Sequence, residues 1–348
     1  MPRVVGCASG SPSSLKRDSK YAHRANRTLV GKTTYRQPVA PGQALTSPTA
    51  FGIPLPNGPF ALSLRAMSAD TFEIVTVARG ARSVRSLRHA ETFHPGVGPM
   101  EEARSLHATQ QRLVERAREP GGGPFVVWDV GLGAAANALA ALEAFRDAGA
   151  MPRAVEMHSF DRTLAPLEFA LGRAAELGYF EGWETAVAGL LRDGAVRCGP
   201  VLWRLQAGDF RERLLDASIP PPHAVLFDPY SPATNPELWN LATFAAVRRR
   251  VGDEPCLLTS YSCSTAVRVT LLLAGWFVGR GDAIGEKAET TVAASRRDLL
   301  TAPLEAAWLG RVRRSSAAGP LLGPGIAPRP PGEIADELAG HPQFSAVG

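Results

Sequence analysis

A rigid loop bordered by prolines carries the side chains best suited to chemistry. Residues 227–239 read FDPYSPATNPELW and follow an apolar run that predicts a buried strand, so Asp228 is delivered to the edge of a sheet. The prolines stiffen the loop and remove backbone donors, which leaves carbonyl oxygens beside the ring of Tyr230. Such a loop can accept N–H bonds from a neutral amine while the tyrosine packs against the substrate. The alternative is a turn that caps the next helix, with Asn235 as N-cap and Pro236 in the first turn. That alternative explains neither the carboxylate nor the tyrosine.

A glycine loop follows the first strand of the predicted sheet. The strand at residues 125–130 ends near Asp129, and Gly131 and Gly133 then lead into an alanine-rich helix. Glycines let the backbone approach a ligand closely, and a helix N-terminus offers free N–H groups. The dinucleotide fingerprint needs a third glycine where this chain has alanine, and an acid at the strand end disfavours a pyrophosphate. The pattern suits a ligand with an ammonium group, such as S-adenosylmethionine, and a purely structural glycine turn explains it equally well.

Two further acids end neighbouring strands. Asp161 follows the strand at residues 154–160 and can accept hydrogen bonds from both hydroxyls of a ribose. Asp209 follows the strand at residues 201–206 and can accept from the exocyclic amine of adenine. Taken alone, each is equally well explained as a helix cap or a turn residue. Acids at the ends of three successive strands, however, favour a nucleoside-type cofactor over three unrelated caps.

Alternating strands and helices must position these side chains. A hairpin is predicted over residues 72–88 and a helix over residues 99–117, ahead of the alternation. Alternation implies a mostly parallel sheet covered on both faces, with ligands bound beyond the carboxyl ends of its strands. The sequence therefore predicts an α/β fold with a seven-stranded, mostly parallel sheet and an N-terminal β-hairpin addition. The seven strands are predicted at residues 125–130, 154–160, 201–206, 224–228, 256–260, 276–280 and 290–294, and helices at 134–148, 166–177, 236–250 and 267–274.

The positive charge of the chain is concentrated at one end. The 348 residues carry a formal net charge of +5, but residues 1–68 hold nine Lys or Arg and one acid. The rest of the chain is slightly acidic, so the charge by itself does not predict a nucleic-acid-binding core. The basic segment either holds RNA phosphates or is a solvated, transit-like extension.

Several other classes of protein are disfavoured. The four cysteines are scattered and form no C-x-x-C pair, which is typical of reduced thiols in a cytoplasmic protein. No apolar run reaches the roughly 18 residues that a membrane span needs. The seven histidines form no metal-binding pattern, and the chain has neither a Walker A loop nor a nucleophile elbow. We therefore expect no metal and no membrane association.

Composition divides the chain into four parts. Residues 1–68 form a basic extension predicted to be disordered, and residues 69–120 hold the hairpin and a helix. Residues 121–312 form the alternating core, and residues 313–348 are predicted to be a flexible tail rich in proline and glycine. The chemistry should therefore reside in the third part.

The motifs of this core resemble the methyltransferase domain of the tRNA 5-methylaminomethyl-2-thiouridine biosynthesis protein family. The similarity is carried by the segments DVGLGAAAN (129–137), AGD (207–209), LFDPYSPATNPELW (226–239), TSYSCS (259–264) and GEKAETTV (285–292), and upstream by ETFHP (91–95) and GPMEEA (98–103). It implies a class I Rossmann-like methyltransferase fold that uses S-adenosylmethionine. It also implies methylation of the aminomethyl group of a modified wobble uridine in tRNA. Bifunctional members add a flavin-dependent oxidase domain, and the length of this chain leads us to expect the methyl-transfer half without flavin.

The resemblance also assigns residues to the two halves of the site. Asp228 would lie beside the accepting amine as the catalytic residue. The methyl donor would be bound by Asp129, Gly131, Gly133, Asn137, Asp161 and Asp209, and the substrate by Glu102, Pro229, Tyr230, Tyr261 and Lys287.

The chain departs from the family in one segment that bears on tRNA contact. Glu286 and Ala288 stand where bifunctional members are basic, so that only Lys287 remains. Three functions therefore stay open: a tRNA methyltransferase, a methyltransferase of small-molecule amines, and a nucleoside- or RNA-binding module without catalysis. The first would place the protein in the cytoplasm with tRNA as partner, functionally linked to upstream tRNA-modifying enzymes or a separate oxidase.

Overall fold

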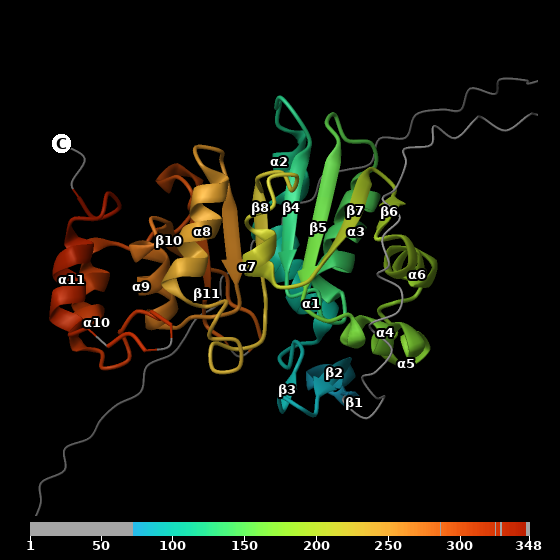
Figure 1. The fold of residues 1–348 in the computed structure, drawn as a ribbon, viewed down its shortest axis with the longest axis horizontal. Coiled ribbons are helices and arrows are strands. Elements are labelled where there is room, and N and C mark those ends of the chain that lie inside the picture. The colour runs from blue at the N-terminus through green and yellow to red at the C-terminus, as the bar shows by residue number, and fades with distance from the viewer. Residues whose placement is uncertain (1–71, 286, 324, 328, 346–348) are drawn as a thin grey trace, which may run out of the picture. The chain divides into compact units, whose positions relative to one another are not determined.

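A mixed, mainly parallel sheet forms the centre of the fold (Figure 1). The computed structural model describes residues 72–285, 287–323, 325–327 and 329–345, so the extension predicted over residues 1–68 lies outside the described part. Within that part the sheet has eight strands. In spatial order they are β10 (Phe277–Gly281), β11 (Thr290–Ala294), β9 (Leu257–Ser260), β8 (Ala224–Phe227), β4 (Phe125–Val130), β5 (Val155–Asp161), β7 (Val201–Ala207) and β6 (Ala195–Cys198).

The sheet contains one strand more than the seven predicted. β6 pairs antiparallel with β7 at the sheet edge, and the pairing runs from Ala195 opposite Arg204 to Cys198 opposite Val201. Its four residues lie directly after a helix and before a glycine turn. A segment this short has too little periodicity to predict a strand. The other seven strands lie where they were predicted, within two residues at each end.

The strand order reverses between β4 and β8. β4 pairs in parallel with β5 on one side and with β8 on the other, and Asp129 is opposite both Ser159 and Leu226. β5 also pairs in parallel with β7, where Asp161 is opposite Ala207. The carboxyl ends of these four strands therefore lie at one edge, and the reversal leaves a crevice there.

Helices cover both faces of the sheet (Figure 1). Side chains along β4 alternate between two cores, because successive residues of a strand point to opposite faces. Phe125 and Val127 belong to the core that includes α3, while Val126 and Trp128 belong to the core that includes α8 and α9. The helices are α1 (Pro99–Ala103), α2 (Leu113–Arg118), α3 (Ala136–Ala148), α4 (Ala165–Gly172), α5 (Ala174–Leu177), α6 (Glu184–Asp193), α7 (Phe210–Arg213), α8 (Leu241–Val251), α9 (Thr265–Leu273), α10 (Leu309–Arg314) and α11 (Pro331–Ala339).

The hairpin predicted before the core is present and is extended by a third strand. β1 (Phe72–Thr76) pairs antiparallel with β2 (Arg82–Ser86), which pairs with the two-residue β3 (Glu91–Thr92). The single helix predicted over residues 99–117 is instead broken into α1, a π-helical stretch (Arg104–Thr109) and α2. The break precedes Arg112, whose φ of 49° is left-handed. Apolar periodicity gives no signal for such a local change of pitch.

The helix after the proline-bordered loop begins later than predicted. Asn235 is not its N-cap, because α8 begins at Leu241 and is capped by Asn240, whose Oδ1 accepts from the N–H of Thr243 at 3.0 Å. The residues in between form turns, in which the Nε1 of Trp239 donates to the carbonyl of Tyr230 at 2.7 Å. The buried tryptophan thus holds these residues against the loop. The capping explanation of Asn235 and Pro236 is therefore wrong.

The C-terminal segment packs against the sheet edge, whereas a flexible tail was predicted for residues 313–348. Ile334 and Leu338 of α11 are buried in the core that also holds α8 and α9. The side-chain amide of Gln343 donates to the carbonyl of Val278 and accepts from its N–H, both at 2.7 Å. Two apolar residues one turn apart on this short helix anchor it to the core. The many prolines and glycines around it give the segment a composition typical of a flexible tail. Among the described residues we find no helix whose length and apolar character would let it cross a membrane.

Candidate functional site

The crevice between β4 and β8 brings the glycine loop and the proline-bordered loop together. Gly131 follows β4 with a φ of 91°, which favours glycine. A Cβ at this position would lie 2.8 Å from both the carbonyl oxygen of Asp228 and the Cα of Pro229. The contact therefore requires glycine, and it fixes the backbone of Asp228 against the start of the loop.

Asp228 and Asn137, which were predicted separately, are direct partners. The Nδ2 of Asn137, in the first turn of α3, donates to Asp228 Oδ2 at 2.7 Å. Burial raises the pKa of the Asp228 carboxyl, while His94, the Asn137 amide and Lys287 oppose that shift. The side chain retains 12% of its exposure. The carboxylate is thus held in place yet open on one side.

His94 lies between two carboxylates of this site, although no role was predicted for it from the sequence. Its Nε2 is 3.6 Å from Asp228 Oδ2, and its Nδ1 is 3.8 Å from Glu102 Oε2. Burial alone would lower the pKa of the imidazole, but Asp228 and Glu102 outweigh burial and raise it. The sequence could have pointed to it only through the segment 91–95, which resembles the family but has no chemical role assigned to its histidine.

Glu102, predicted to bind substrate, is fixed by the backbone before α1. The N–H of Val97 donates to its Oε1 at 3.0 Å. Burial would raise the pKa of Glu102, but His94 and the backbone donors lower it overall. Gly96 leaves room for this carboxylate, because a Cβ there would come within 2.5 Å of Oε1. Glu102 therefore faces His94, with the imidazole between it and Asp228.

The proline-bordered loop is braced from within the protein. Tyr261 Oη donates to the carbonyl of Pro229 at 3.3 Å, and the carbonyl of Tyr230 accepts from a tryptophan indole as described above. The ring of Tyr230 packs against His89 and Phe93, with centroids 4.7 and 5.4 Å apart. The loop carbonyls were expected to accept from a substrate amine. Those of Pro229 and Tyr230 each already accept one hydrogen bond, so the charged carboxylate of Asp228 is the stronger acceptor for an amine.

The ammonium group of Lys287 lies over the ring of Tyr261, which contacts the proline-bordered loop. Lys287 Nζ is 4.7 Å from the ring centroid of Tyr261 and donates to the carbonyl of that residue at 3.3 Å. Lys287 is exposed, whereas Tyr261 is partly buried. The structure thus brings Lys287, Tyr261 and Pro229 together at the start of the proline-bordered loop. Glu286 lies outside the described residues.

Asp129 provides an unsatisfied acid at the base of the crevice. Its side chain is fully buried, and Oδ2 accepts from Ser159 Oγ at 2.7 Å. Within the part of the chain that the structure describes, Oδ1 has no hydrogen-bond partner. Burial raises the pKa of Asp129 to about 7, with smaller contributions from Asp228 and Asp161 and an opposing contribution from the Ser159 hydroxyl. An unpaired buried oxygen of this kind is costly unless a donor reaches it.

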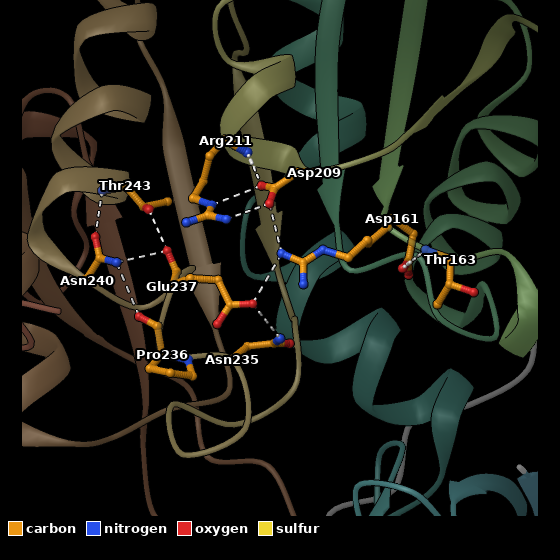
Figure 2. A network of polar contacts seen from close by, with 10 residues as sticks. Asp161, Thr163, Asp209, Arg211, Asn235, Pro236, Glu237, Asn240 and Thr243 are labelled. Atoms are coloured by element: carbon orange, nitrogen blue, oxygen red, sulfur yellow. Dashed lines mark hydrogen bonds and ion pairs between the residues drawn. The ribbon is translucent and has the colours of Figure 1, made fainter. Parts of the chain in front are cut away.

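Asp161 ties the glycine loop to the end of β5. Its Oδ2 accepts from the N–H of Gly133 at 2.9 Å. Its Oδ1 accepts from the N–H of Thr163 at 3.1 Å, a contact drawn in Figure 2. Burial raises the pKa of this carboxyl despite these donors. Because a carboxylate oxygen can accept more than one hydrogen bond, each oxygen retains capacity for a ribose hydroxyl.

In contrast, donors from the protein itself already occupy the acceptor sites of Asp209. It caps α7 by accepting from the N–H of Arg211 at 2.9 Å, and its oxygens also accept from the guanidinium of Arg211 at 2.6 and 3.0 Å (Figure 2). Arg162 Nη2 donates to Oδ2 at 2.8 Å and lies 3.3 Å from Glu237. The Arg211 side chain holds the pKa of Asp209 well below its usual range. An adenine amine would have to displace an arginine to use this carboxylate.

The residues of the crevice fit S-adenosylmethionine better than a phosphate-bearing cofactor. The N–H groups of Gly131 and Leu132 both donate to the carbonyl of Phe160, at 3.0 and 3.1 Å, so they are not available to cradle phosphate. The unpaired oxygen of Asp129 suits an ammonium group, which this donor carries. No cluster of three or more metal-ligating side chains occurs among residues whose placement is described.

Comparison with known proteins places the fold. Residues 182–296 match a family model described as S-adenosyl-L-methionine-dependent methyltransferase. Among solved structures, MnmC2 from Aquifex aeolicus aligns with a TM-score of 0.57 and 24% sequence identity, over 77% of this chain and 84% of that one. The class I Rossmann-like fold predicted from the sequence is thereby confirmed.

Curated relatives are similar over most of this chain. Two of them are named tRNA 5-methylaminomethyl-2-thiouridine biosynthesis bifunctional protein MnmC. The protein of Ectopseudomonas mendocina is 28% identical over 256 residues, and that of Aromatoleum aromaticum is 32% identical over 262 residues. Both alignments cover 70% of this chain and 38% of the relative, so the chain spans less than two fifths of the length of these proteins.

Proposed function

We propose that this chain, an S-adenosylmethionine-dependent methyltransferase of class I fold, methylates the aminomethyl group of a modified uridine at the wobble position of tRNA. One observation carries the proposal: Asp228, at the head of a braced aromatic loop, contacts Asn137 of the glycine-loop helix. An acceptor held by Asp228 would therefore lie next to a donor held by the glycine loop.

The chemistry divides between the donor and the side chains of the crevice. S-adenosylmethionine supplies, when bound, a sulfonium methyl group that an amine lone pair can take. Asp129 would pair with the ammonium group of the donor and Asp161 with its ribose, while Gly131, Gly133 and Asn137 shape the pocket. Aligning two reactants in this way can lower a barrier by about 7–11 kcal/mol.

The acceptor must lose a proton before it can attack. An alkyl amine resembles lysine, with a pKa of about 10.4, and is mostly protonated at neutral pH. Burial lowers the pKa of such an amine, whereas a nearby carboxylate raises it. Asp228 therefore positions the amine and receives or relays its proton. Tyr230 would pack against the uracil ring, and Tyr261, Pro229 and Glu102 would complete the substrate side.

The choice of tRNA as substrate is supported by the names of the relatives and by the exposed charge of Lys287. Lys287 is exposed beside Tyr261 and can meet a phosphate. The relatives are named for tRNA 5-methylaminomethyl-2-thiouridine biosynthesis. The reaction would take place in the cytoplasm, after the enzymes that install the aminomethyl group or alongside a separate flavin-dependent oxidase.

The deciding experiment compares acceptors for a labelled methyl group. Purified protein is incubated with methyl-labelled S-adenosylmethionine and either tRNA that bears 5-aminomethyl-uridine, the same tRNA without the modification, or a panel of small amines. We expect label in the first tRNA only. Transfer to small amines instead would make the protein a small-molecule methyltransferase, and donor binding without any transfer would leave a non-catalytic module.

A further inference from the structure

The imidazole of His94 occupies a position that the proposed reaction can use. It lies between Asp228, the proposed holder of the acceptor amine, and Glu102 on α1, at 3.6 and 3.8 Å. The side chains of the three residues retain 11–12% of their exposure, so each is largely buried but not sealed from solvent. Separations of this size exceed a direct hydrogen bond, but catalytic contacts often shorten when substrate binds or are bridged by one water.

His94 has a backbone conformation that both its residue type and the proline after it disfavour. Its φ is 48°, in the left-handed region, and the next residue is Pro95, which disfavours helical conformations in the residue before it. Histidine enters the left-handed region more readily than most residues, yet the conformation still has a cost. A residue held in this way beside a reactive carboxylate points to a function for its side chain.

The charges around His94 come from several elements. Asp228 follows β8, Glu102 lies on α1, and Asp129 is on β4, and all three favour the imidazolium form. Lys287 faces Asp228 from the segment before β11. Burial, and to a smaller extent His94, lowers the pKa of His107 in the π-helical stretch, so His107 does not compete as a cation. The carboxylates dominate, so the pocket can stabilise a proton that arrives at the imidazole.

We propose that His94 receives, through Asp228, the proton that the acceptor ammonium must lose, and passes it by way of Glu102 to solvent. The inference rests on the function proposed above. Deprotonation frees the nitrogen lone pair, which forms the new N–C bond while the electron pair of the S–C bond stays on sulfur. One proton is released per turnover, and the product amine leaves protonated. Because His94 acts through Asp228, it is a positioning residue that also takes up the proton.

The test is the pH profile of a set of variants. Wild type should lose kcat as the pH falls through the pKa of His94, because a protonated imidazole cannot accept a second proton. His94→Asn tolerates the left-handed backbone, and we expect it to lose kcat by about 100-fold together with the acidic limb of the profile. Glu102→Gln should move that limb to lower pH. Glu101→Gln, the exposed neighbour, is the matched control and should leave both unchanged.

A second measurement does not depend on the acceptor. NMR of the free protein with labelled histidine should show His94 titrating above the ordinary value of 6.5, and lower in Asp228→Asn and Glu102→Gln. Titration of wild-type His94 at or below 6.5 overturns the inference. Two results for His94→Asn would also overturn it: a kcat within about threefold of wild type, or a loss of activity with the acidic limb of the pH profile unchanged. If wild type methylates small amines rather than tRNA, the proposed function fails, and the same pH profiles on that amine decide the role of His94.

Discussion

The acids at the carboxyl ends of the strands are stabilised in opposite ways in two regions of the sheet. On the β5–β7 side, Asp209 is held by Arg162 and Arg211, and its pKa is depressed. On the β4–β8 side, Asp129 keeps one unpaired oxygen, and Asp228 shares its surroundings with a histidine and has a raised pKa. Asp209 is therefore electrostatically closed, although Asp161 on the same side keeps a raised pKa and spare acceptor capacity. Asp129 and Asp228 lack such compensation and leave acceptor capacity for a cationic ligand and for a proton.

This difference separates structural acids from reactive ones. An acid that accepts several hydrogen bonds from arginine gains little from a further ligand, because its lone pairs are already used. A buried acid without enough donors is destabilising by itself, and such groups are concentrated at functional sites. The contrast predicts that equal substitutions on the two sides will have unequal effects on activity.

The largest effect is expected at Asp228. Asp228→Asn keeps the shape of the side chain but removes the charge that holds the acceptor amine, so kcat should fall by about 100-fold or more. Binding of S-adenosylmethionine, measured by calorimetry, should change by no more than about threefold. The matched control is Asp209→Asn, the same chemical change at the electrostatically closed acid, which should leave kcat within about threefold. Near-normal turnover by Asp228→Asn would contradict the assignment.

An intermediate effect is expected at Asp129, in donor binding. Because its pKa is raised to about 7, wild type should bind S-adenosylmethionine more tightly as pH rises from about 5.5 to about 8, when the carboxylate becomes available to the ammonium group. Asp129→Asn should bind about tenfold more weakly at pH 8 and lose this pH dependence, since tenfold corresponds to about 1.4 kcal/mol. Equal pH dependence in both proteins would show that the donor does not use this acid.

Thermal unfolding without donor provides the control for Asp129. A carboxyl whose pKa is raised in the folded state holds a proton that the unfolded chain releases. Its contribution to stability is therefore present below about pH 4 and is lost as pH rises through about 7. Stability of wild type should thus decline relative to Asp129→Asn over this interval. A constant difference between the two proteins would indicate that burial leaves the acid unperturbed.

The sequence predicted the fold and the positions of the acids because both follow from regular patterns. Parallel strands must end at one edge, so acids at or just after the ends of β4, β5, β7 and β8 had to lie near one another. The difference between Asp209 and the other acids was not predicted. Arg162 follows Asp161 in the sequence, but in the structure its guanidinium pairs with Asp209.

What could not be predicted depends on contacts between distant segments. His94 lies in an irregular loop, and its meaning arises only when α1 and the loop after β8 close around it. Likewise, the sequence predicts exposed carbonyls in the proline-bordered loop, but it does not show that Tyr261 and Trp239 donate to those of Pro229 and Tyr230. Hydrogen bonds of this kind follow from tertiary packing, which hydrophobic periodicity does not encode.

The smallest effect is expected at Asp209, and it should appear in stability rather than in catalysis. Asp209→Ala removes the N-cap of α7 together with the partner of two arginines, which should lower the free energy of unfolding by about 1 kcal/mol. Asp209→Asn keeps a capping oxygen and should lower the free energy of unfolding by only about a few tenths of a kcal/mol. Urea denaturation measures both values, and methyl transfer is assayed on the same samples. If either variant instead weakened donor binding by tenfold or more, Asp209 would contact the adenine after all, and its arginine partners would have to move when donor binds.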